Sequence, residues 1–302
     1  MSPKSTLKIP AASAVDYQFQ RLLKNNTEGA AIIESKAIKL FMEMAGRKPE
    51  KWRDEIKMKS EKLRGRFSSM ANILNLCGHI ENLVIHESPR QFINALKGHQ
   101  RDISNNRKRT VISASKAMAQ FNCIFTISNS SSIGEALLKA SLRGWRGQVL
   151  IAESRPKNEG SEFAVRLAKN GINTILAVDA AMPHFIALAD AVFLGADAAS
   201  PGLFLNKLGS KIAVDYAARY RIPCFIVFDK SKWIDIKNFP LSETARSAKE
   251  ISRASLSKLT VFNKYFEAVV PIGKIRYICG DKLIKPKNVR RQSQSPLRKR
   301  RK

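Results

Sequence analysis

Cysteine and histidine are scarce in this chain, which has four of each among its 302 residues. Cys77, Cys123, Cys224 and Cys279 lie far apart, and neither a C-x-x-C nor an H-x-x-x-H spacing occurs. Metal sites in proteins need such ligands to converge, so we expect neither a metal ion nor a cofactor. Cys123 and Cys224 lie within apolar runs, which is typical of reduced thiols packed as small hydrophobic side chains in a cytosolic protein.

Long apolar runs are also missing. No run approaches the roughly 18 residues that a membrane-spanning helix needs. The first residues, MSPKSTLKIPAAS, lack the apolar core of a signal peptide. We therefore expect a cytoplasmic protein that does not associate with a membrane. The apolar fraction of 44% is ordinary for a globular protein, and the length suits about two domains.

Acidic residues are few beside basic ones, 25 against 53, so the formal net charge is +28. Such an excess attracts nucleic acids or phosphorylated metabolites, and dispersed lysines serve equally for solubility. Residues 282–302 hold ten basic residues, no acidic one and few large apolar groups. We predict a disordered basic tail there, which either binds RNA through its phosphates or is solvated without a dedicated partner. The tail has no aromatic residue for base stacking.

The spacing of apolar residues divides the rest of the chain. It predicts an N-terminal helical domain over residues 1–108. After Gln120, short apolar runs alternate with amphipathic helices. From this change of pattern we predict a domain boundary at 108/109. Continuous apolar strands joined by helices predict a Rossmann-like α/β domain over 109–281, with a parallel sheet covered on both faces. The predicted strands are FNCIFTI, QVLIAE, TILAVD, AVFLGAD, IPCFIVF and AVVPI.

Small hydroxyl groups gather in TISNSSSIGEALLKA (126–140), between a predicted strand and a predicted helix. Ligands of parallel sheets bind outside the carboxyl ends of the strands. Backbone amides at a helix N-terminus, together with Ser130, Ser131 and Ser132, make an anion site suited to phosphate. The alternative is ordinary N-capping, although a cap needs one serine and the turn has three in succession.

Charged and amide side chains follow other predicted strands. Arg155 comes after QVLIAE and suits either a phosphate or a structural carboxylate. Asp197 ends AVFLGAD, Asn206 and Lys207 lie in LNKLGS, and Lys232 lies in FDKSKW. A carboxylate among cations and amides suits general acid–base chemistry on a phosphorylated sugar. An ordinary ion pair between Asp197 and Lys207 is the alternative.

Taken in order, several of these pieces resemble one superfamily over roughly residues 110–280. It contains the α, β and δ subunits of translation initiation factor 2B, ribose-1,5-bisphosphate isomerase and 5-methylthioribose-1-phosphate isomerase. The matching pieces are TISNSSS, ESRPKNEG, GADAASPGLFLNKLGS, FDKSKW and FEAVVPIGKI, with EGAAIIESKAIKLF and RFSSMANILN as weaker helical motifs. The SKW segment is more similar to the factor 2B and ribose-bisphosphate branch. The resemblance implies a helical domain, a Rossmann-like domain and dimerisation through the latter.

The resemblance also implies roles for individual residues. Asp197 stands where the isomerases have their catalytic acid, and Ser128 stands where they have a cysteine. Asn206 and Lys207 match a substrate-binding pair, Lys232 matches a further substrate contact, and the three serines match the phosphate-binding helix start. The implied ligand-binding set is completed by Gly29, Ala30, Arg66 and Arg155.

Three positions depart from the isomerase pattern. A serine hydroxyl at Ser128 does not ionise near neutral pH without a neighbouring base, whereas a thiol does. Glu28 replaces an arginine, and Glu159 replaces a neutral amide. These departures favour a regulatory or binding protein like the factor 2B subunits, with a relict pocket for a phosphorylated sugar or a nucleotide. Expected partners are further copies of the chain, as a homodimer or higher oligomer, and the initiation factor 2 α subunit. The alternative is an aldose–ketose isomerase acting on a phosphorylated pentose such as ribose 1,5-bisphosphate.

Overall fold

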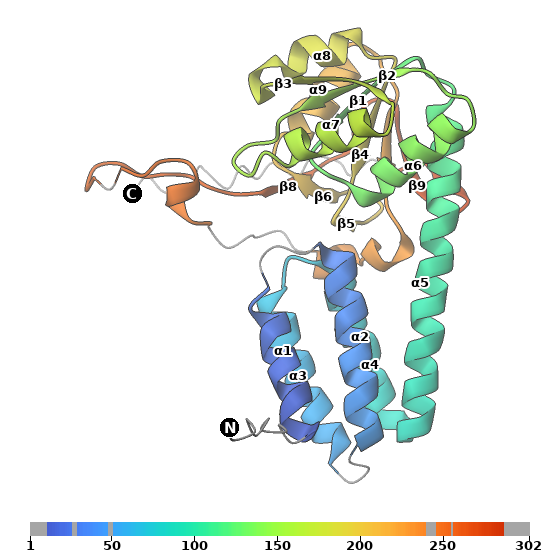
Figure 1. Cartoon of the computed structure of the whole chain (residues 1–302), viewed down its shortest axis with the longest axis vertical. Coiled ribbons are helices and arrows are strands. Elements are labelled where there is room, and N and C mark those ends of the chain that lie inside the picture. The colour runs from blue at the N-terminus through green and yellow to red at the C-terminus, as the bar shows by residue number, and fades with distance from the viewer. Residues whose placement is uncertain (1–10, 26–28, 48–50, 240–245, 255, 287–302) are drawn as a thin grey trace, which may run out of the picture.

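The computed structural model describes residues 11–25, 29–47, 51–239, 246–254 and 256–286 (Figure 1). Its N-terminal part is a bundle of helices, as the apolar spacing predicts. Their apolar faces meet in one core, where Phe19, Phe41, Trp52 and Phe92 are fully buried. The helices are α1 (Ala11–Leu23), α2 (Ala30–Arg47), α3 (Trp52–Arg66), α4 (Ala71–His86) and α5 (Pro89–Met118).

Helix α5 connects the bundle to the rest of the chain. Ser88 and Gln91 form a reciprocal capping box at its start, and Pro89 occupies the first turn. Its 30 residues extend about 45 Å, from the bottom of the bundle to the sheet (Figure 1). The predicted boundary at 108/109 therefore falls inside a continuous helix, which serves both parts of the molecule.

The second part contains a seven-stranded sheet in the order β10-β9-β7-β4-β1-β2-β3. Its neighbouring strands are parallel except β10, which runs antiparallel to β9. This confirms the predicted parallel-sheet α/β architecture. The strands are β1 (Cys123–Ile127), β2 (Gln148–Ala152), β3 (Asn173–Ala177), β4 (Ala191–Gly195), β7 (Cys224–Val227), β9 (Ile275–Cys279) and β10 (Lys282–Ile284).

Helices cover both faces of this sheet, and each face has its own core. Phe125 on β1 faces one core with Val214, and the adjacent Ile124 faces the other with Leu137. The edge strand β3 is less covered than predicted, because Ile175 and Leu176 are both more than 40% exposed. The helices are α6 (Ser131–Leu142), α7 (Glu159–Lys169), α8 (Met182–Leu188) and α9 (Ser210–Arg219), with short 3-10 helices at Asp179–Ala181, Lys230–Lys232, Ile236–Asn238 and Ala248–Glu250.

Two predictions about the C-terminal third need correction. The run AVVPI contributes to β8 (Phe266–Val269), which lies outside the main sheet and pairs with β6 (Phe204–Lys207), itself paired with β5 (Ala198–Ala199). The predicted tail begins too early, because Lys282–Ile284 forms β10 after a turn at Gly280, whose φ is 64°. A strand of three residues is too short to leave a periodic signal. Residues 287–302 lie outside the described part.

Two expected absences can be examined in the described residues. None of the helices placed there has the length and apolar character needed to cross a bilayer. The same residues contain no group of three His, Cys, Asp or Glu side chains arranged to hold a metal ion. All four cysteines are free thiols, and Cys77 and Cys224 are buried.

A histidine pair joins α4 to α5. The rings of His79 and His99 stack with centroids 4.7 Å apart, and both Nε2 atoms are buried without a hydrogen-bond partner in the described structure. Burial lowers the pKa of both imidazoles. For His99, the neighbouring His79 adds to this effect and the pKa falls to about 4.

We predict that this pair destabilises the fold in acid. The pKa of His99 is depressed on folding, so its contribution to stability is complete above about pH 6.5 and is lost as the pH falls toward 4. The loss should reach about 2 kcal/mol at pH 4.5. Urea unfolding at pH 7.5 and 4.5 measures it, and His99→Gln should lose less stability between the two pH values than the unmodified chain. Equal losses would contradict the assignment.

Candidate functional site

The carboxyl ends of β1 and β4 meet closely, and Gly195 makes this possible. A Cβ atom at Gly195 would lie 2.8 Å from Ser130 Oγ, which is closer than side chains pack. It would also lie 3.8 Å from Asn206 Oδ1. Asn206 is buried and donates to Ser210 Oγ at 2.9 Å. The structure thus brings together the start of α6 and the predicted Asn206–Lys207 pair.

The three serines at the start of α6 have different surroundings. Ser130 is the N-cap of α6 and accepts from the Ile133 N–H at 3.4 Å, as the capping interpretation predicts. Ser131 is exposed, and Ser132 is buried. The turn therefore retains one exposed serine at the helix N-terminus beside Gly195, which is compatible with an anion site but needs no ligand to explain Ser130.

Ser128 and Ser154 share an unusual backbone conformation at neighbouring strand ends. Their φ angles are 60° and 64°, in the left-handed region that non-glycine residues adopt uncommonly. The Ser128 N–H donates to Ser154 Oγ at 2.7 Å. The N–H groups of Ser154 and Arg155 donate to the carboxylate of Asp179, each at 2.8 Å. This network fixes Ser128 in a conformation that the local sequence alone does not favour.

Asp197 and Lys232 lie together at the ends of β4 and β7. Lys232 Nζ is 3.6 Å from Asp197 Oδ1 and donates to the Ala196 carbonyl at 2.6 Å. Helix α4 supports this arrangement, because Asn75 Nδ2 donates to the carbonyls of Ser231 and Trp233 at 2.7 and 2.9 Å. A partly exposed carboxylate beside an ammonium group is therefore held between the two parts of the molecule.

Lys207 is paired with a carboxylate of this chain. Its ammonium donates to both oxygens of Glu159, at 3.0 and 2.9 Å, and lies 4.9 Å from the centre of the Tyr265 ring. The Lys207 side chain is only 3% exposed. The alternative pairing of Lys207 with Asp197 is wrong, because Glu159 in the first turn of α7 reaches the lysine and Lys232 neighbours Asp197.

The other predicted ligand residues occupy the periphery. Arg155 is exposed. Arg66 donates through Nε to the Leu23 carbonyl at 2.8 Å, so it holds the end of α1. Gly29 and Ala30 form the start of α2, where Asn72 Nδ2 donates to the Ala30 carbonyl at 2.8 Å. Glu28 lies outside the described residues.

One charged pair escaped the sequence analysis. Asp229 follows β7 and its carboxylate accepts from Arg107 of α5 at 3.1 and 3.2 Å. Burial opposes ionisation of Asp229, but the cations of Lys232 and Arg107 and the Ser231 hydrogen bonds outweigh it and hold the pKa below its usual range. A polar residue directly after a predicted strand was the available signal, and its partner is distant in sequence.

Comparison with known proteins identifies a family whose model matches most of this chain. The model of the Initiation factor 2 subunit family matches residues 26–263. A ribose 1,5-bisphosphate isomerase of Archaeoglobus fulgidus is 27% identical over 256 residues, which cover 80% of each chain. The translation initiation factor eIF2B subunit alpha of Caenorhabditis elegans is 28% identical over 121 residues, covering 40% of this chain and 39% of the relative.

Solved structures share the fold. The Pyrococcus horikoshii translation initiation factor eIF-2B aligns with a TM-score of 0.77 at 21% identity, over 92% of this chain and 98% of that one. A chain of the tetrameric eIF2B β2δ2 complex from C. thermophilum aligns with a TM-score of 0.67 at 14% identity, over 91% of each chain. At these identities the likeness establishes the architecture.

We predict that Glu159→Gln destabilises the protein. It leaves the buried ammonium of Lys207 without its counter-charge, at a cost of about 2–4 kcal/mol. Urea unfolding at pH 7.5 measures the change. Glu162→Gln is the matched control, because Glu162 also lies in the first turn of α7 but is exposed and should change stability by less than about 0.5 kcal/mol. Equal effects of the two substitutions would contradict this role of Glu159.

Proposed function

This chain belongs to the initiation factor 2 subunit family, and we propose that it is a regulatory or binding protein of translation initiation. A ligand site at the carboxyl ends of β1, β2, β4 and β7 would bind a phosphorylated sugar or a nucleotide without converting it. The observation that carries this proposal is the ion pair between Glu159 and Lys207. The lysine that the resemblance assigns to a substrate is already neutralised by the protein itself.

Charge supports binding without turnover. A phosphate group that contacts Lys207 must displace a carboxylate that accepts two hydrogen bonds from it. The dianion also meets the negative charge of Glu159, which is 29% exposed. A site with this composition would hold a phosphorylated ligand more weakly than one with a neutral amide at residue 159.

The nucleophile position supports the same interpretation. Ser128 stands where the isomerases have a cysteine, and a serine hydroxyl needs a base to ionise near neutral pH. The hydrogen bond described for Ser128 is made by its backbone N–H, and among the described residues none is hydrogen-bonded to its hydroxyl group. This supports a position that lacks an activated nucleophile.

A sugar-phosphate isomerase is the second candidate function. It is favoured by the match to a ribose 1,5-bisphosphate isomerase over 80% of this chain. The carboxylate of Asp197, 3.6 Å from the Lys232 ammonium, also provides an acid beside a cation, which a proton transfer between two carbons of a sugar requires.

Turnover of ribose 1,5-bisphosphate distinguishes the two functions. We expect no turnover by the unmodified chain, and measurable turnover by the double variant Ser128→Cys/Glu159→Gln, since it restores a thiol and frees Lys207. Adding Asp197→Asn to the double variant should abolish that activity. Turnover by the unmodified chain that disappears in Asp197→Asn would overturn the proposal in favour of the isomerase.

Binding provides the positive test. The initiation factor 2 α subunit and a panel of sugar phosphates are titrated against the full chain by calorimetry. Glu159→Gln should bind the sugar phosphates about tenfold more tightly, which corresponds to about 1.4 kcal/mol, while Glu162→Gln should not. An absence of binding to both the protein and the sugar phosphates would count against the proposal.

Self-association is a further part of the proposal. Ile175 and Leu176 of the edge strand β3, and Val178 after it, are exposed apolar side chains on neighbouring residues. Contact with a second copy would cover them. A tetrameric complex among the structures that share the fold supports a homodimer or a higher oligomer.

We also propose that the basic tail binds RNA electrostatically. Because β10 includes Lys282–Ile284, the informative truncation ends at Pro286 and leaves the sheet intact. It removes eight of the basic residues of the chain. The dependence of log affinity on log salt should flatten by about 0.7 for each single-stranded phosphate contact that is lost. An unchanged slope in filter-binding assays from 50 to 200 mM salt would show that the tail makes no such contact.

A further inference from the structure

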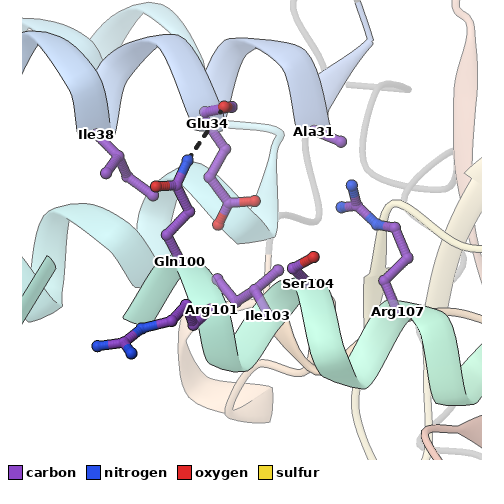
Figure 2. Close-up of a pocket in the computed structure, with 9 residues that line it drawn as sticks. Ala31, Glu34, Ile38, Gln100, Arg101, Ile103, Ser104 and Arg107 are labelled. Carbon is purple, nitrogen blue, oxygen red and sulfur yellow. Dashed lines mark hydrogen bonds between the residues drawn. The ribbon is translucent and has the colours of Figure 1, made fainter. Parts of the chain in front are cut away.

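A cavity of about 360 Å³ lies in the helical part of the molecule, between α2 and α5 (Figure 2). Glu34, Ser35 and Ile38 line it from α2, and Ile103, Ser104 and Arg107 line it from α5. No motif of the sequence predicts a ligand site between these two helices. Glu34 lies in the second turn of α2, whose other buried residues are apolar.

Glu34 is buried with one carboxyl oxygen unused. The residue is 3% exposed, and Oε2 accepts from Asn72 Nδ2 at 3.3 Å. Oε1 is buried and has no hydrogen-bond partner among the described residues. Figure 2 shows the carboxyl group extending from α2 toward α5, into the cavity. Burying a carboxyl oxygen without a partner is unfavourable, so its orientation points to a ligand that supplies N–H donors there.

Arg107 supplies the opposite charge to the same space. Its guanidinium extends from α5 toward α2 in Figure 2. Nε and Nη2 donate to Asp229, which leaves further N–H donors of the guanidinium for a second acceptor. Asp229 offsets part of the charge of Arg107, and Glu34 would repel a phosphate dianion. The cavity therefore favours a singly charged anionic group such as a carboxylate.

The remaining walls limit the size and polarity of an occupant. Ile38 and Ile103 are nearly fully buried and give the cavity an apolar surface. Gln100 Nε2 donates to Ser35 Oγ at 3.4 Å across the space between the helices. An occupant therefore meets a carboxyl group, a guanidinium group and two branched aliphatic side chains.

We propose that this cavity binds a free α-amino acid with an aliphatic side chain. The ammonium group binds Glu34, the carboxylate binds Arg107, and the side chain packs against Ile38 and Ile103. The proposal is independent of the function proposed for the site at the ends of the strands. It rests on the unpartnered carboxyl oxygen, the guanidinium that faces it and the apolar wall that Ile38 and Ile103 form beside Glu34 (Figure 2).

The affinity should depend on pH through Glu34. Burial raises the pKa of Glu34 to about 7, with the Asn72 hydrogen bond lowering it, Asp229 raising it, and Arg107 and Lys232 lowering it. Arg101 is a further charged residue that lines the cavity. The ionised carboxylate is the form that holds an ammonium group. Affinity should therefore increase about tenfold from pH 6 to pH 8, and the increase should be absent in Glu34→Gln.

Calorimetry with the full chain tests the ligand class. Leucine, valine and methionine are titrated at pH 8, beside two probes that each lack one charge of leucine, isoamylamine and 4-methylpentanoate. We expect at least one amino acid to bind, and leucine to bind at least tenfold more tightly than either probe. Glu34→Gln should weaken amino-acid binding at least tenfold. Glu43→Gln, the same substitution on α2 outside the cavity lining, should leave it unchanged.

Several results would overturn the proposal. They are an absence of amino-acid binding at millimolar concentrations, equal binding of leucine and isoamylamine, or equal losses in Glu34→Gln and Glu43→Gln. Nucleoside monophosphates are titrated in parallel. Tighter binding of one of them, lost in Glu34→Gln, would establish a ligand site of a different class and reject the amino acid. Far-ultraviolet circular dichroism of each variant verifies that it is folded.

Discussion

The ion pair between Arg107 and Asp229 holds the two parts of this molecule in register. Asp229 follows β7 and its side chain is only 2% exposed, so its charge depends on the nearby cations of Lys232 and of Arg107 on α5. The same carboxylate accepts from the Ser231 N–H at 3.0 Å and so shapes the 3-10 helix Lys230–Lys232. The position of Lys232 beside Asp197 therefore depends on a contact with a helix that begins in the distant bundle.

Because Arg107 also lines the cavity beside α2, one side chain belongs to two candidate sites of different character. At the ends of the parallel strands, each charged lysine has a carboxylate beside it: Glu159 pairs with Lys207, and Asp197 lies beside Lys232. Between α2 and α5, Glu34 is buried with one carboxyl oxygen unpartnered among the described residues, and burial raises its pKa to about 7. The charges of Asp229, Arg107 and Lys232 have smaller effects on that pKa. Arg107 is therefore the side chain that the two candidate sites share.

Sequence reasoning succeeded where local pattern determines structure. The apolar runs of β1, β2, β3, β4 and β7 and the helices between them were predictable, and so were the strand ends that Asp197 and Lys232 follow. Asn206 and Lys207 instead lie within β6, a short strand that the apolar pattern did not predict. Other features depend on residues far apart in the chain. The partner of Lys207 is 48 residues away and that of Asp229 is 122 residues away, so local spacing contains no signal for either pair. No motif singles out Glu34, because its burial follows from packing against α4 and α5.

Glu159 shows how one substitution changes a site without changing its fold. Lys207 lies among buried side chains and needs a negative partner whether or not a ligand is present. With a neutral amide at residue 159, an incoming phosphate would supply that partner, and binding would gain the full attraction. With Glu159, the pairing already exists in the free protein, so the ligand gains only the difference between two anions. For each 1.4 kcal/mol or so by which the ion pair stabilises the free protein more than the complex, the affinity for the ligand falls about tenfold. The carboxylate that neutralises the buried ammonium of Lys207 would therefore oppose the phosphate binding that we propose for this site.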